Sequence, residues 1–346
     1  MGEACASKSS RGREVEVKRL GALGTMVWDT IHARDAVGGR PVEEWGGICY
    51  GFSAFEAAAP DGWELLPIVK VGANLRERAN AYLRDLSRVG SLDGVLTVPE
   101  ANNEVEIFYG DRARRCETLT GGVPGWTWEE LEPLARTCDA LYVNFIAGWE
   151  LDLPTAQQVR ENHRGPLYCD LHSIFLGVGT GGVREPRPLD EWREWLRCFD
   201  LVQVNEDELK LLAHAWDDPW QLAADVVGEE TKALFVTLGE RGAAWVAESG
   251  FDGLTSEAGG PRSGSAPATR NLASVPRVVR EPDPTGCGDV WGMTCFASLL
   301  GGASLRDAAE RANELAARSA GHRGASRLGP LLARPTRTLE SRARTS

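Results

Sequence analysis

The sequence predicts an α/β protein with a central, mostly parallel sheet covered by helices on both faces, a three-layer α/β/α arrangement. Short apolar runs that end in a glycine or a polar residue alternate along the chain with longer amphipathic segments. That alternation is typical of βαβ units, whose helices cover both faces of a parallel sheet. Ligands of such a sheet bind beyond the carboxyl ends of its strands, so the polar residues that close each run are the first candidates for function.

Six apolar runs are predicted as buried strands and six amphipathic runs as the helices between them. The strands are VKRLGALGTMVW (17–28), WELLPIVKVG (63–72), ALYVNFIAG (140–148), GPLYCDLHS (165–173), CFDLVQVN (198–205) and KALFVTLG (232–239). The helices are RERANAYLRDLSRVG (76–90), TWEELEPLARTC (127–138), TAQQVRENHR (155–164), LDEWREWLRCF (189–199), DELKLLAHAW (207–216) and PWQLAADVVGEE (219–230).

Two segments break this rhythm and predict a small β lid beside the main domain. They are residues 30–50 and 95–120, the second of which alternates like antiparallel strands. Residues 251–275 are rich in Gly, Ser, Pro and Ala and are predicted to form a surface loop. The polar ends, residues 1–14 and 336–346, are predicted to be disordered tails around a single domain of residues 15–335.

Composition excludes several classes of protein. The net charge of −12 over 346 residues argues against a nucleic-acid partner, because such proteins gain affinity by neutralising phosphates with a basic face. We expect no membrane partner and a cytoplasmic location, since no stretch approaches the ~20 apolar residues of a membrane span and the first residues lack the apolar core of a signal peptide. The eight cysteines show no CxxC pair, so we expect them to be reduced.

The stretch EPDPTGCGDVWG places Gly286, Cys287, Gly288 and Asp289 just before an apolar run that is predicted as a buried helix. The unpaired N–H groups of a helix start form an anion site, and glycines let an anion approach the backbone. Asp289 would lie beside that anion, where a carboxylate can take the proton of a hydroxyl that attacks phosphorus. From these residues alone, a plain helix cap is the more common interpretation, because Asp is favoured at helix starts.

The segment Asp283-Pro284-Thr285-Gly286-Cys287-Gly288-Asp289 strongly resembles the signature Asp-Thr-x-Gly-Ala-Gly-Asp of the ribokinase-like (PfkB) carbohydrate kinase family. Further segments resemble the family in the same order along residues 19–328. They are Gly24–Asp29 at the first strand, Gly46-Gly47, Lys70-Val71-Gly72, Asn205 with Glu208, Thr237 with Gly239 and Gly242, and the final core helix with Asn313.

This resemblance implies a three-layer α/β/α ribokinase-like fold with a small β lid, and an ATP-dependent phosphotransferase. The acceptor would be a hydroxyl of a sugar, nucleoside or related polyol, with Asp289 as base and the backbone of Gly286, Cys287, Gly288 and Asp289 as anion hole. Roles carried over from the family are substrate binding by Asp29, Gly46 and Gly47, nucleotide binding by Thr237, Gly239, Gly242 and Asn313, and organisation of Mg²⁺ through water by Asn205 and Glu208. The resemblance is also compatible with a homodimer formed through the lid.

The sequence departs from the family on the substrate side, at Val27, Gly51 and Asn74. A second hypothesis is therefore a catalytically inactive ligand-binding or regulatory protein on the same fold. Simpler readings also stay open for single residues: Glu208 as a solvated first-turn residue, Asn313 as solvent-exposed, and Thr237 with Gly239 and Gly242 as a strand end and a turn. Asp29 is expected to close a buried strand at the ligand edge, where it either binds substrate or stabilises a turn, and Gly46 with Gly47 is also typical of a plain turn. Asp283 is expected to cap or bridge the anion loop and is assigned no catalytic role. His172 either contacts substrate or phosphate or is structural, and Trp28 and Trp45 either stack on a ligand or belong to the core.

Overall fold

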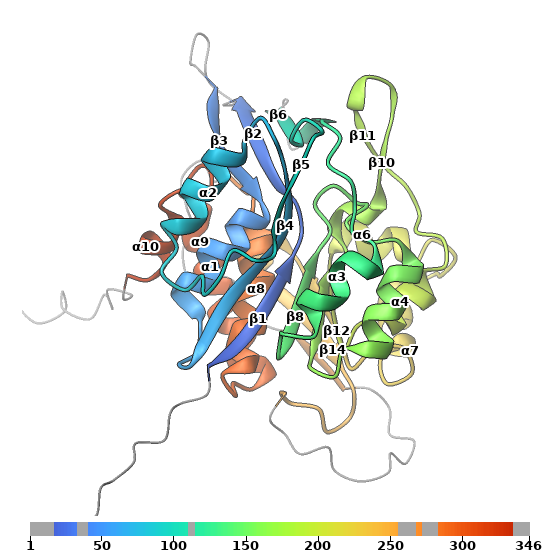
Figure 1. The fold of residues 1–346 in the computed structure, drawn as a ribbon. Helices are drawn as coiled ribbons and strands as arrows, with labels where there is room; N and C mark the ends of the chain where they lie inside the picture. Colours follow the sequence, from blue (N-terminus) through green and yellow to red (C-terminus); the bar gives the residue numbers. More distant parts are fainter. Residues whose placement is uncertain (1–16, 33–40, 110–114, 255–267, 272–282, 335–346) are drawn as a thin grey trace, which may run out of the picture.

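The computed structural model describes residues 17–32, 41–109, 115–254, 268–271 and 283–334. The two predicted tails lie outside these residues. A nine-stranded sheet forms the centre, in the order β15-β14-β13-β12-β9-β8-β1-β4-β5 (Figure 1). Its strands are β1 (Lys18–Leu23), β4 (Trp63–Gly72), β5 (Val95–Val98), β8 (Ala140–Asn144), β9 (Leu167–Asp170), β12 (Leu201–Asn205), β13 (Ala233–Thr237), β14 (Ala243–Ala247) and β15 (Ala268–Asn271). The seven neighbouring strands β5, β4, β1, β8, β9, β12 and β13 pair in parallel. Strand β14 pairs antiparallel with both β13 and β15.

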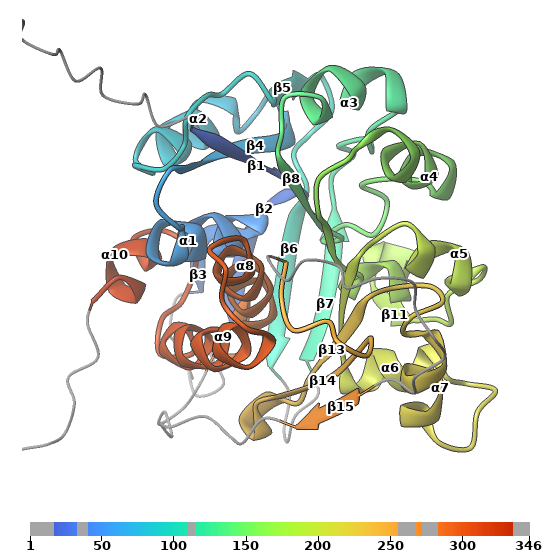
Figure 2. The same ribbon diagram turned by 90° about the horizontal axis from the view of Figure 1, so that it is seen from below.

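Helices cover both faces of this sheet, which confirms the predicted three-layer class (Figure 2). One face carries α1 (Ile48–Ala58), α2 (Arg76–Arg84), α8 (Cys287–Leu300), α9 (Leu305–Ser319) and α10 (Leu328–Leu332). The other carries α3 (Trp128–Ala135), α4 (Leu153–Asn162), α5 (Trp192–Arg197), α6 (Glu206–Leu212) and α7 (Pro219–Val226).

The period of two along each strand divides the apolar residues between two cores. In β8, Ala140 and Tyr142 belong to the core under α8, whereas Leu141 and Val143 belong to the opposite core. Full burial of a side chain such as Leu141 or Val143 stabilises the fold by about 1.5–3 kcal/mol. The same alternation sends the last residue of β8, Asn144, toward the α8 face.

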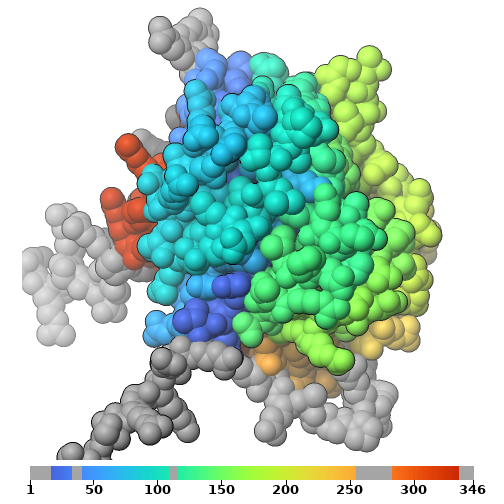
Figure 3. Space-filling view, in the orientation of Figure 1, coloured from blue at the N-terminus to red at the C-terminus, as the bar shows by residue number. Residues whose placement is uncertain are grey.

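A separate four-stranded sheet forms the lid, in the order β3-β2-β6-β7. Its strands are β2 (Met26–His32), β3 (Val42–Gly47), β6 (Glu104–Tyr109) and β7 (Arg115–Thr120). The hairpin β10 (Leu176–Val178) and β11 (Arg184–Pro186) contacts this lid through a bridge between Val183 and Thr118. Figure 3 shows the lid strands β2 and β3 in blue and the hairpin in yellow-green at the same end of the molecule.

The predicted layout differs from the structure in several places. Residues 17–28 form two strands, because the chain turns at Gly24 and Thr25 from the main sheet into the lid. Residues 95–98 pair with β4 in the main sheet, so the second lid segment begins later than predicted. The first lid segment ends at Gly47, where α1 begins. The predicted surface loop contains β15, which pairs with β14; residues 255–267 and 272–275 of that loop lie outside the described residues.

Candidate active site

The glycine-rich turn before α8 is fixed by backbone geometry and close packing. Gly286 is the N-cap of α8 with φ of 74°, in the left-handed region that favours glycine. A Cβ at this position would overlap the ring of Tyr50 from α1. The carboxylate of Asp283 accepts the N–H of Thr285 at 3.0 Å and thereby caps the turn, one of the roles that the sequence left open for it.

Cys287 is turned away from the mouth of this turn. Its thiol lies 3.5 Å from Ser319 Oγ in α9, and burial raises the pKa of the thiol to about 11. Its backbone N–H donates to Pro284 O at 3.1 Å and closes a turn. The backbone N–H of Cys287 is therefore already satisfied within the turn.

Asp289 lies in the first turn of α8 and receives a hydrogen bond from the main sheet. Asn144 Nδ2 donates to Asp289 Oδ1 at 2.6 Å, and Asn144 itself is fully buried. The sequence reasoning did not name Asn144. The sequence gives a weak signal for it, a polar residue in the middle of the predicted run ALYVNFIAG (140–148).

Three adjacent strands, β8, β9 and β12, each place a polar side chain beneath the start of α8. Asn144, Asp170 and Gln203 continue the α8-facing side of their strands. Gln203 Nε2 donates to Asp170 Oδ2 at 2.9 Å and to Gly288 O at 3.1 Å. This polar layer connects the sheet to the glycine-rich turn.

Asp170, His172 and Glu208 form an electrostatically coupled group at the same edge. Burial raises the pKa of Asp170 to about 8; the His172 charge opposes this shift, and Glu208 and Asp289 add to it. Burial opposes the charged form of His172, but Glu208, whose Oε1 lies 2.6 Å from His172 Nδ1, and Asp170 outweigh it and raise the pKa of His172 to about 9. His172 is thus hydrogen-bonded, which agrees with a structural role, and its side chain remains 38% exposed.

Asn205 and Glu208 form a reciprocal capping box at the start of α6. Asn205 Oδ1 accepts the N–H of Glu208 at 2.9 Å, and Glu208 Oε2 accepts the N–H of Asn205 at 2.7 Å. Glu208 is buried, which excludes the solvated first-turn reading. Thr237 is the register partner of Asn205 on the neighbouring strand, so these predicted residues lie side by side.

The remaining predicted nucleotide residues lie on the turn after β13 and on α9. Gly239 and Gly242 both have positive φ, 59° and 87°, at the ends of the 3-10 turn between β13 and β14, and a Cβ on Gly239 would meet open space. Asn313 is buried, not solvent-exposed. Its Oδ1 accepts from Trp291 Nε1 at 2.8 Å, and its Nδ2 has no hydrogen-bond partner among the described residues.

The predicted substrate residues lie on the lid strands. Asp29 is buried in the middle of β2, so it does not close a strand of the main sheet as the sequence suggested. Gly46 and Gly47 end β3, and a Cβ on Gly46 would overlap the carboxylate of Asp29. The structure therefore brings Asp29 and Gly46 into direct contact.

The rings of Trp28 and Trp45, the two candidate stacking residues, contact neighbouring side chains. Trp28 and Trp45 make an edge-to-face contact with ring centroids 5.2 Å apart. Trp45 is buried, and the guanidinium of Arg78 lies over the ring of Trp28. These contacts favour the core reading for Trp45.

The residues that depart from the family pattern are accommodated without strain. A Cβ on Gly51 would lie 3.6 Å from Met293 of α8, an ordinary contact. Asn74 Oδ1 accepts the N–H of Asn102 at 2.8 Å, and Val27 is buried. Asn74 thus holds the loop that precedes β6.

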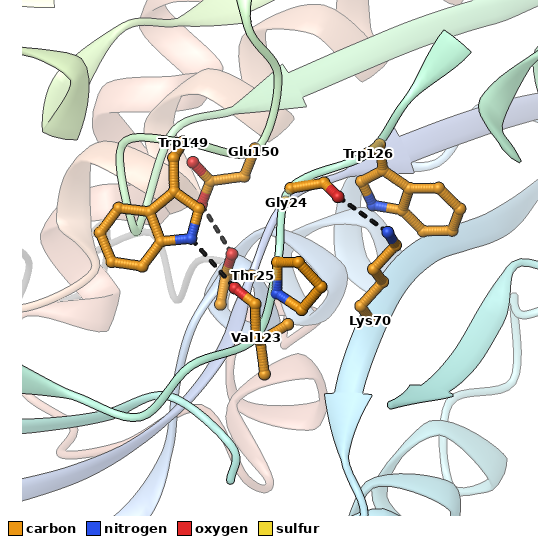
Figure 4. Close-up of a pocket in the computed structure, with 9 residues that line it drawn as sticks. Gly24, Thr25, Lys70, Val123, Trp126, Trp149 and Glu150 are labelled. Atoms are coloured by element: carbon orange, nitrogen blue, oxygen red, sulfur yellow. Dashed lines mark hydrogen bonds between the residues drawn. The ribbon is translucent and has the colours of Figure 1, made fainter. Parts of the chain in front are cut away.

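A small cavity lies where β1 and β4 end, with Trp149 and Glu150 on one side and Lys70 and Trp126 on the other (Figure 4). Its volume of about 10 Å³ is on the scale of one water molecule. Lys70 Nζ donates to Gly125 O and to Glu130 Oε2, each at 2.7 Å, and the hydrogen bond from Lys70 lowers the pKa of Glu130. Lys70 therefore ties β4 to α3.

Within the described residues, every helix is too short or too polar to cross a lipid bilayer. The same part of the chain holds no cluster of three or more His, Cys, Asp or Glu side chains arranged to bind a metal ion. Hydrated Mg²⁺ needs few direct protein ligands, so Asn205 and Glu208 fit an ion held through water or phosphate.

Residues 178–330 match the family model described as pfkB family carbohydrate kinase. The predicted resemblance to the PfkB carbohydrate kinases is confirmed. This PfkB match covers the glycine-rich turn, Asn205, Glu208, the β13–β14 turn and Asn313, whereas Asp29, Gly46 and Gly47 precede it. The comparison with curated proteins gives no match.

Solved structures similar to the chain share this PfkB-type, ribokinase-like fold. A putative ribokinase II from E. coli in complex with ATP and Mg²⁺ is 16% identical with a TM-score of 0.64, covering 91% of this chain and 99% of that one. A Burkholderia thailandensis nucleoside kinase in complex with inosine is 16% identical with a TM-score of 0.64, covering 90% and 93%. A pyrophosphate-dependent kinase of the ribokinase family, complexed with a pyrophosphate analog and myo-inositol, is 16% identical with a TM-score of 0.62, covering 88% and 95%.

Proposed function

We propose that this protein is a kinase that transfers the γ-phosphate of ATP to a hydroxyl of a sugar, nucleoside or related polyol. The observation that carries the proposal is the position of Asp289, in the first turn of α8 directly after Gly286 and Gly288, where the helix start favours an anion. The family match and the similarity to kinases of sugars, nucleosides and inositol support the same reaction class.

In the proposed step, Asp289 takes the proton of the acceptor hydroxyl as its oxygen forms a bond to the γ-phosphorus. The bond from that phosphorus to the β–γ bridging oxygen breaks, and ADP leaves. Backbone N–H groups of the turn stabilise charge on the transferring phosphoryl; removing one such donor in other enzymes costs roughly 10²- to 10³-fold in kcat. Asn205 and Glu208 would position hydrated Mg²⁺, which neutralises phosphate charge when bound.

The nucleotide would lie along the β13–β14 turn and α9. Thr237 and Gly239 offer a backbone that a phosphate can approach, and the buried Nδ2 of Asn313 lacks a partner among the described residues. Asp29, Gly46 and Gly47 would bind the acceptor from the lid.

The test is acceptor-dependent ADP release over a panel of sugars, nucleosides and polyols with Mg·ATP, and pyrophosphate as the alternative donor. Asp289→Asn should retain nucleotide binding and lose most turnover. An Asp289→Asn variant with the wild-type kcat would overturn the proposed base. Inactivity over the whole panel, together with tight binding of one compound, would favour the alternative of a ligand-binding protein, which the departures at Val27, Gly51 and Asn74 motivate.

A further inference from the structure

Asn144 makes an unusual set of contacts for a buried asparagine. A carboxamide offers two donors and an acceptor with two lone pairs. Its Nδ2 donates to Asp289 Oδ1 at 2.6 Å, and its Oδ1 is buried with no hydrogen-bond partner among the described residues. An unsatisfied buried acceptor costs about 1–3 kcal/mol.

Asn102 shows what a structural asparagine looks like in the same chain. Its Oδ1 accepts the N–H of Gly72 at 3.1 Å, and its Nδ2 donates to Met26 O at 3.0 Å and to Asn103 O at 2.9 Å. Both ends of that side chain are satisfied by backbone groups, so local stability accounts for it. The same account fails for Asn144, whose side-chain hydrogen bond within the described residues reaches Asp289 across 145 positions of sequence.

We propose that Asn144 is a positioning residue for phosphoryl transfer, which fixes the Asp289 carboxylate at the start of α8. This inference rests on the proposed function, in which Asp289 is the base. Asn144 ends β8, a central strand of the sheet, so its amide is held by a rigid element. A base held in one orientation stays aligned with the acceptor hydroxyl whose proton it takes. A 1 Å misplacement of a reacting group can cost about 10²-fold in rate.

Asn144 also bears on the charge of Asp289. Among the acids that interact electrostatically with Asp289 are Asp170 on β9, Tyr142 on β8, Cys49 on α1 and Cys287 on its own helix. The amide of Asn144 is a neutral donor that favours the ionised carboxylate, the form that accepts a proton. Removing the amide should therefore shift the acidic limb of the kcat profile to higher pH.

The experiment compares Asn144→Leu with Thr294→Val as the matched control. Thr294 is fully buried on the same helix as Asp289, and its hydroxyl has no hydrogen-bond partner among the described residues. We expect Asn144→Leu to lower kcat by about 10²-fold, with both KM values within a few-fold of wild type and the acidic limb shifted upward. Thr294→Val should leave kcat and its pH dependence unchanged. Asn144→Ser replaces Asn144→Leu in this comparison if leucine prevents folding.

A double variant, Asn144→Asp with Asp289→Asn, separates the effect of Asn144 on turnover from its effect on stability. It keeps an amide and a carboxylate in contact but moves the base to β8, so it should recover the stability lost in either single variant and not the turnover. A double-mutant cycle of unfolding free energies detects the coupling of residues 144 and 289 even before an acceptor is known.

Additive unfolding energies, or an Asn144→Leu enzyme with the wild-type kcat and an unchanged acidic limb, would overturn this inference alone. An active Asp289→Asn enzyme would instead overturn the proposed base.

Discussion

Gly46 of β3 lies directly against the carboxylate of Asp29 on the neighbouring strand β2: a Cβ at residue 46 would occupy the place of Asp29 Oδ2. Asp29 is buried within the lid sheet. The absence of a side chain at residue 46 therefore leaves the space that the Asp29 carboxylate occupies.

Gly46→Ala should displace the Asp29 carboxylate and weaken acceptor binding. Losing a hydrogen bond to a charged group costs about 1.5–3 kcal/mol, so we expect the acceptor KM to rise roughly 10- to 100-fold while the ATP KM stays unchanged. Steady-state kinetics with each substrate varied in turn measures this difference. Gly51→Ala is the matched control, because its Cβ would make an ordinary 3.6 Å contact with Met293. Equal changes in both KM values would show that Asp29 does not bind the acceptor.

Much of the main sheet could be predicted, because strands such as β8 and β13 are continuous apolar runs that end in polar residues. The lid boundary could not. Gly24 and Thr25 turn the chain inside one apolar run, and the residues on both sides are buried, so hydrophobicity does not change where the strand leaves the main sheet. For the same reason Asp29 was placed at the wrong edge. Strand β15 was missed because its pairing with β14 is a tertiary contact, whereas the surrounding composition is typical of a loop.

Gly286 and Gly288 face different neighbours, although both precede the proposed base. Gly286→Ala should destabilise the protein, because a left-handed non-glycine residue costs about 1–2 kcal/mol and its Cβ would overlap the ring of Tyr50. Gly288→Ala should fold normally, since its nearest neighbour would be Gln203 Nε2 at 3.7 Å. We expect a lower Tm only for Gly286→Ala, measured by calorimetry, and a lower kcat for both if an anion approaches this turn. Full activity of Gly288→Ala would argue against that approach.

The glycine-rich turn and its aspartate could be predicted because their residue types and spacing are contiguous in the sequence. The polar layer beneath them could not, because Asn144, Asp170 and Gln203 come together only through the strand order β12-β9-β8. Each is a polar residue inside a predicted apolar run, which distinguishes it from its neighbours but does not show its partner. Cys287 illustrates the opposite case, since its place in the motif gave no indication that the thiol is turned into α9.

Asp170 gives the stability of this protein a pH dependence of known sign. Its carboxyl has a pKa of about 8 in the folded protein, raised by burial, against about 4 in an unfolded chain. Between these values the folded state keeps a proton that the unfolded state has lost, so this group lowers the unfolding free energy as the pH rises from about 4 to about 8, with no further change above that range.

The amide introduced by Asp170→Asn cannot ionise, so this variant should lack the fall in unfolding free energy that Asp170 causes as the pH rises. The Tm of the variant minus that of the wild type should rise between pH 5 and pH 8, by about 1–2 °C for each 1 kcal/mol, and then level off. Thermal unfolding in a series of buffers at constant ionic strength measures the difference, and the pH 5 values serve as the internal reference for packing changes around Gln203, whose Nε2 donates to Asp170 Oδ2. A Tm difference that is constant from pH 5 to pH 9 would mean that Asp170 is already ionised in the folded protein, held by its hydrogen bonds from Gln203 and the His172 backbone.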